Sequence, residues 1–128
     1  MKKISSFLLI VLLTITLTRI WSLSLFYIFG NGGEFIEKII NDPYHHYQVG
    51  ILLLALAYPL RKLFNPKITA AIGLGIFLEE WPVFLTDLEL KTTQYYHTKI
   101  DFMVIIGIVG LLYILSLLHN YHTTEYGN

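Results

Sequence analysis

The sequence predicts an all-α protein, a polytopic membrane helix bundle with four transmembrane helices. Two observations predict this fold class. Hydrophobic residues make up 55% of the 128 residues and charged residues only 14%, and the charges are concentrated between long apolar runs. A soluble domain normally carries about 25% charged residues, so lipid is the expected solvent. Almost nothing remains once the apolar runs are removed, and we therefore expect residues 1–128 to form a single transmembrane domain.

The first predicted span covers residues 7–29, which is long enough to cross the hydrocarbon of a bilayer. Lys2 and Lys3 precede this run, as basic residues precede the apolar region of a signal peptide. A signal peptide has a shorter apolar region, however, and a small-residue cleavage site follows it. No convincing Ala-x-Ala site is present, so we expect this segment to be retained as a membrane helix rather than cleaved.

The second predicted span covers residues 44–64. Asp42 is suited to cap a helix that starts at Pro43, because proline is favoured at the first helical position. The apolar part of this span, from Val49 to Leu60, is short. The helix therefore crosses the membrane only if its histidine-bearing first turn lies within the membrane domain.

The third and fourth predicted spans cover residues 67–85 and 99–119. Asn65-Pro66 supplies the turn before the third span, and Pro82 is expected to kink it. The segment between these two spans is polar and mixed in charge.

The distribution of basic residues predicts the orientation. Lys2 and Lys3 lie at the N-terminus, and the turn between the second and third spans carries Arg61, Lys62 and Lys67 with no acidic residue. Lysine and arginine favour the cytoplasmic side, so we expect a multi-pass protein of the cell membrane with both termini in the cytoplasm.

With this orientation, polar residues from separate spans converge in the outer half of the bilayer. Charges within a span are costly, face the bundle interior and usually mark a site. We expect Arg19 to pair with Glu79 or Glu80, either as a structural ion pair or as part of the site itself.

Glu79, Glu80, His45 and His46 are the candidate metal ligands. Imidazole and carboxylate together suit zinc, iron, manganese or copper, and a divalent metal is the predicted cofactor. Glu79 and Glu80 are also the candidate catalytic residues, because a carboxylate beside a metal can take a proton from bound water. The alternative for the histidines is a role as interfacial anchors.

Two further residues are predicted to support this cluster. Asp101 lies in Thr98-Lys99-Ile100-Asp101, which resembles a capping box at the start of the last span. His97 follows two tyrosines in the preceding loop, where it is either a site residue or a member of an aromatic belt.

Several function classes are excluded. The formal net charge is zero, so no basic surface for nucleic acid is expected. The chain has no cysteine, which excludes disulfides and thiolate chemistry. The motifs of soluble zinc proteases, serine hydrolases and phosphate-binding loops are absent.

Two short motifs carry a family resemblance. His45-His46-Tyr47-Gln48-Val49-Gly50 and Gly73-Leu74-Gly75-Ile76-Phe77-Leu78-Glu79-Glu80 resemble a group of small, uncharacterised prokaryotic integral membrane proteins. In that group a His-His-aromatic-x-x-Gly motif opens one helix, a Gly-x-Gly-x-x-x-[Asp/Glu]-Glu motif lies in the next, and an acidic position corresponds to Asp101. The resemblance covers roughly residues 42–105 and implies a shared fold and polar site, without an activity.

Three functions remain open at this point. The chain is a membrane-embedded metal protein acting on a lipid or small molecule, a structural or accessory subunit of a membrane complex, or a subunit of a cation or proton carrier. The lipid bilayer is the expected partner in each case. A carrier would require a homo-oligomer, because so few helices do not suffice for a monomeric transporter.

Overall fold

The structure is a computed structural model that describes residues 2–29, 45–90 and 99–125. All regular elements in these three ranges are helices, which confirms the all-α class for this part of the chain. They are α1 (Lys2–Phe29), α3 (His46–Leu56), α4 (Pro66–Glu79), α5 (Trp81–Asp87) and α6 (Lys99–Glu125).

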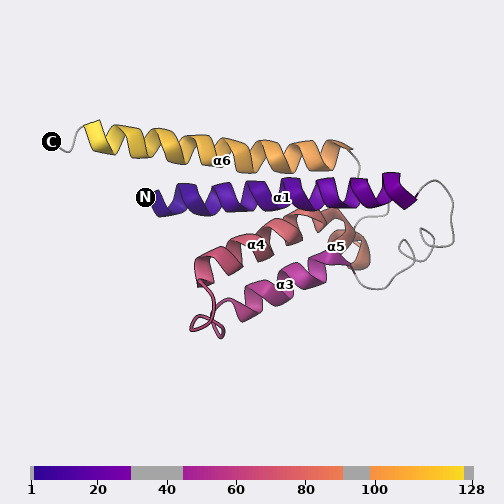
Figure 1. Cartoon of the computed structure of the whole chain (residues 1–128). Coiled ribbons are helices and arrows are strands. Elements are labelled where there is room, and N and C mark those ends of the chain that lie inside the picture. The colour runs from indigo at the N-terminus through magenta and orange to yellow at the C-terminus, as the bar shows by residue number, and fades with distance from the viewer. Residues whose placement is uncertain (1, 30–44, 91–98, 126–128) are drawn as a thin grey trace.

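The helices lie side by side in the order α6, α1, α4, α3 (Figure 1). Helices α1 and α4 run in one direction and α3 and α6 in the other. The short helix α5 lies at the end of the molecule where α3 begins. The apolar core between α1, α4 and α6 is centred on Val11, Ile15, Ala71, Ile105 and Val109.

Helices α1 and α6 are each long and apolar enough to cross a membrane. Their apolar stretches are Ile4–Leu25 and Ile100–Tyr121, both of 22 residues, which corresponds to about 33 Å of helix and matches the hydrocarbon thickness. Both helices continue beyond the predicted bounds, α1 from Lys2 and α6 to Glu125.

The second predicted span is shorter than expected. Helix α3 has 11 residues, about 17 Å, which does not cross the hydrocarbon. His45 has an extended backbone with ψ 149°, so the helix begins at His46 and not near Pro43. Residues 57–60 form turns, because Pro59 lacks the N–H that would continue the ladder. The predicted cap Asp42-Pro43 lies outside the described residues.

The third predicted span is a bent pair of helices. The side chain of Asn65 accepts a hydrogen bond from the backbone N–H of Lys67 and caps α4. Helices α4 and α5 meet at Glu80 with an angle of 64° and together are apolar enough to count as one broken span or a re-entrant segment. The described helices thus supply two long spans, or up to three with the bent pair, and do not reach the four predicted.

Glycines bring α3 and α4 into backbone contact. A Cβ atom at Gly50 would lie 2.7 Å from the carbonyl oxygen of Gly73 and from the backbone nitrogen of Phe77. No larger residue fits there without a shift of one helix. This close approach places the first turn of α3 against the C-terminal end of α4, where the two glutamates lie.

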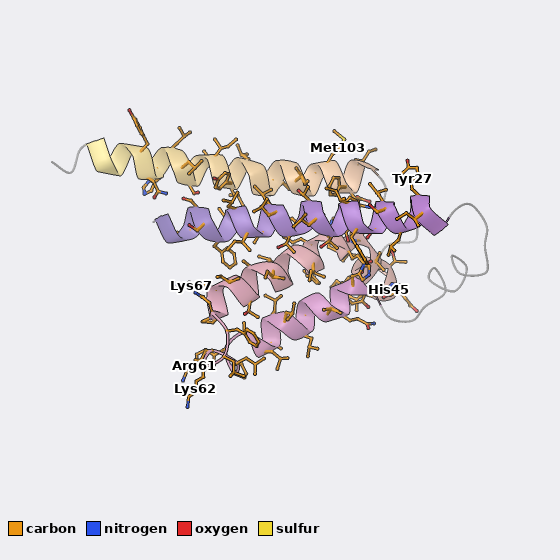
Figure 2. All side chains as sticks on the ribbon, viewed as in Figure 1. Tyr27, His45, Arg61, Lys62, Lys67 and Met103 are labelled. Carbon is orange, nitrogen blue, oxygen red and sulfur yellow. The ribbon has the colours of Figure 1, made fainter. Side chains whose placement is uncertain are left out.

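Basic residues and His45 mark opposite ends of the α3–α4 hairpin (Figure 2). Arg61, Lys62 and Lys67 lie at the end shared with the start of α1 and the end of α6, whereas His45 lies at the end shared with Tyr27 and Met103. The polar cluster therefore lies at the end of the molecule remote from the basic turn.

Candidate functional site

The two adjacent glutamates are both buried, because the helix breaks between them. Neighbouring residues of a continuous helix point about 100° apart and rarely share one interior face. Helix α4 ends at Glu79, and Glu80 has φ −107° and ψ 16°, outside the α-helical region. Only 1% of Glu79 and 7% of Glu80 is exposed. The bend thus directs two carboxylates into the same protein interior.

Glu80 is held against the start of α3. Its Oε1 lies 3.2 Å from Nδ1 of His46, and its Oε2 accepts a 2.9 Å hydrogen bond from the backbone N–H of Tyr47. The first N–H groups of a helix have no partner within the helix and favour a negative charge. Glu80 therefore satisfies the end of α3 and places His46 beside the glutamate pair.

His46, Glu79 and Glu80 form a group with metal-ligand spacing. One ligand atom from each residue lies within 4.8 Å of the other two. A side-chain set of one imidazole and two carboxylates suits zinc, iron, manganese or copper. The imidazole is half-exposed, with 48% of the side chain accessible, whereas both carboxylates are covered.

Arg19 extends the cluster from α1 to α6. Its Nε lies 3.2 Å from Oε1 of Glu79, and its guanidinium carbon lies 4.5 Å from the ring centroid of Phe102. The first contact is an ion pair and the second a cation–π contact. Of the two glutamates that the sequence offered to Arg19, the structure pairs it with Glu79.

Glu79 keeps unused hydrogen-bonding capacity. Within the described residues, neither of its carboxylate oxygens has a hydrogen-bond partner, although Oε1 lies close to Arg19. The buried indole N–H of Trp81, two residues along, also has no partner there. Most buried polar atoms in proteins are satisfied, and each exception calls for an explanation such as a bound ion.

The remaining predicted site residues are not members of this ligand group. Nε2 of His45 lies 3.9 Å from Oδ2 of Asp87, and its ring stacks on that of Tyr47 at 5.8 Å. Asp101 lies in the first turn of α6, as a carboxylate at a helix start should. His97 and the predicted capping residue Thr98 lie outside the described residues.

Tyr47 and Asp87 form a contact that the sequence did not predict. The hydroxyl of Tyr47 donates a 2.6 Å hydrogen bond to Oδ2 of Asp87, and its ring packs edge-on against Phe84 at 5.4 Å. Tyr47 therefore holds both Glu80, through its backbone, and Asp87, through its side chain. Its position next to His46 was the available clue to this role.

Comparison with family models, with curated proteins and with solved structures finds no match to this chain. The site is therefore interpreted from its own geometry and chemistry.

Proposed function

We propose that the chain is a membrane-embedded metal-binding protein in which His46, Glu79 and Glu80 hold one divalent transition metal ion. The observation that carries this proposal is the burial of Glu79. Both of its oxygens lack hydrogen-bond partners among the described residues, yet they lie in a group whose ligand atoms are within 4.8 Å of one another. A divalent cation would satisfy these oxygens and offset the negative charge that Arg19 alone leaves on the pair.

The reaction class that fits this site is metal-assisted hydrolysis of a lipid or small molecule. His46, Glu79 and Glu80 would hold the ion and leave one coordination position open, and a bound metal would supply activation of a water molecule for attack. An oxygen of Glu79 or Glu80 that is not engaged by the ion would accept the proton. The imidazole of His46 is 48% exposed and the side chain of Glu80 only 9%, so a substrate would reach the group past His46.

A second function is favoured by the contacts of Arg19. The ion pair with Glu79 and the contact with Phe102 join α1, α4 and α6. Without a metal, the same cluster would serve as a lock between helices in a structural or accessory subunit of a membrane complex. The carboxylate oxygens of Glu79 that lack hydrogen-bond partners would then destabilise the folded protein, so metal binding is the first proposal.

We also propose an orientation in which the site lies in the outer half of the bilayer. The start of α1, the basic turn and the end of α6 share one end of the molecule, and basic residues favour the cytoplasm. Both termini would then be cytoplasmic. The resemblance of residues 42–105 to small prokaryotic membrane proteins stays a prediction, as does the fourth span.

Metal analysis of the purified full-length protein tests the proposed function. We expect about one transition metal ion per chain, and its loss in His46→Ala and Glu80→Gln. Removing an outer-shell partner already lowers metal affinity about 10–100-fold, and removing a ligand should lower it at least as much.

His45→Ala is the matched control, because His45 is adjacent to His46 yet lies outside the ligand group. This variant should keep its metal. A natural chain that is folded, metal-free and unable to take up added zinc, iron, manganese or copper would overturn the metal proposal and leave the structural function.

A further inference from the structure

An open groove lies beside the candidate metal group. It has a volume of about 560 Å³ and is lined by Leu17, Ile20 and Trp21 of α1, His46 and Val49 of α3, and Ile76 of α4. Its size lies within the range of about 300–1,000 Å³ typical of ligand sites. The groove is largely apolar, and Thr18 and Ser24 complete its lining.

His46 belongs to both the groove and the metal group. Its Nδ1 lies 3.2 Å from Oε1 of Glu80, 48% of its side chain is accessible, and the residue lines the groove. A molecule lying in the groove would therefore bring one end to the imidazole. The apolar lining requires the rest of that molecule to be hydrocarbon.

The surroundings of the groove determine the class of its occupant. The lining residues of α1 lie within the candidate membrane span Ile4–Leu25, and Leu17, Ile20 and Trp21 are 64%, 54% and 61% exposed. In a bilayer Leu17 and Ile20 would face acyl chains. A lipid can enter from the side, whereas a water-soluble molecule would have to displace lipid first.

We propose that this groove binds the acyl chain of a membrane lipid and presents the polar end of that lipid to His46. The side chain of Trp21, about 6 Å along the helix from Leu25, is suited to the headgroup level, where tryptophan is enriched. For the chemistry at His46 this inference rests on the proposed function, and it names a lipid as the substrate class. The groove itself depends only on its own lining residues.

Native mass spectrometry of the full-length protein, released from nanodiscs of phosphatidylethanolamine and phosphatidylglycerol, tests the inference. We expect one lipid to remain bound per chain. Val49→Trp fills the groove and should lower the lipid-bound fraction about tenfold, because a packed space does not accept added bulk. Ile51→Trp is the matched control, since Ile51 is on the same helix, is 42% exposed and does not line the groove.

The outcomes separate the groove from the metal site. A natural chain that retains no lipid, or a Val49→Trp variant that retains as much as Ile51→Trp, overturns the groove. If circular dichroism shows that Val49→Trp has lost helix, Leu17→Trp against Leu13→Trp on α1 decides the question in the same way. Metal content is measured in the same samples, so that a chain that binds lipid but no metal contradicts only the proposed function.

Discussion

The backbone N–H of Tyr47 donates a 2.9 Å hydrogen bond to Oε2 of Glu80, which fastens the start of α3 to the break between α4 and α5. Both residues are buried, with 9% and 7% of their surfaces exposed. A buried donor that loses its acceptor pays the full cost of desolvation. This contact therefore helps to hold His46 beside the glutamates, together with the close approach of α3 and α4 at Gly50.

Two substitutions of Glu80 distinguish its role as a hydrogen-bond acceptor from its role as a negative charge. We expect Glu80→Ala to lower the free energy of unfolding by about 1–3 kcal/mol, because the N–H of Tyr47 is left unsatisfied. Glu80→Gln keeps an acceptor oxygen and should lose less stability. Denaturant titration in detergent micelles with a chelator present measures both variants, and equal losses would show that the hydrogen bond does not matter.

The Arg19–Glu79 pair should behave as a coupled unit. Arg19→Met leaves a buried carboxylate without its cation, and we expect a loss of about 3–5 kcal/mol in unfolding free energy. The double variant Arg19→Met with Glu79→Gln removes both charges and should recover most of that loss. A double-mutant cycle on thermal unfolding measures the coupling, and simple additivity would contradict the pairing.

The helix contact at Gly50 should not tolerate a methyl group. A Cβ there would lie 2.7 Å from two backbone atoms of α4, so Gly50→Ala should push α3 from α4, destabilise the protein and reduce metal content. Gly107→Ala on α6 is the matched control, since its Cβ would have nothing within 4 Å. That variant should be neutral or more stable by about 0.5–1 kcal/mol, because alanine favours helix. Similar melting temperatures for the two variants would refute the close contact.

The proposed orientation is open to a labelling test, because the chain has no cysteine. Tyr27 lies at the end of the molecule that carries the site and is 80% exposed, whereas Lys62 lies in the basic turn. Each is replaced by cysteine in a separate variant. With a membrane-impermeant maleimide, intact cells should label Tyr27→Cys, and Lys62→Cys should react only after lysis. The reverse pattern would invert the orientation.

Hydropathy was sufficient to predict the long helices α1 and α6, and the positions of proline predicted the turn at Asn65-Pro66 and a kink near Pro82. Hydropathy overestimated the length of α3, because a hydropathy window counts apolar residues and ignores whether the backbone remains helical. Pro59 lies inside the predicted span of residues 44–64. Because it has no backbone N–H to donate, the helix ends before it and turns follow. A proline inside an apolar run therefore predicts a shorter helix than hydropathy alone.

The sequence predicted the residue types of the site and the pairing of Arg19 with one of the glutamates, but not the other contacts. The common depth of His46 and the glutamates stays a prediction. The burial of both glutamates depends on a break at Glu80, two residues before Pro82. The link from Tyr47 to Asp87 depends on the 64° turn of α5, which periodicity does not encode.

The ion pair between α1 and α4 also has a consequence for how the protein is made. Arg19 leaves the ribosome with the first span, whereas Glu79 follows some sixty residues later. Until α4 enters the bilayer, α1 carries an uncompensated arginine that costs about 2.5–3.5 kcal/mol at the helix centre on insertion scales. Its flanking apolar residues must offset that cost alone. Membrane integration of α1 should therefore be the step most sensitive to truncation of the nascent chain before residue 79.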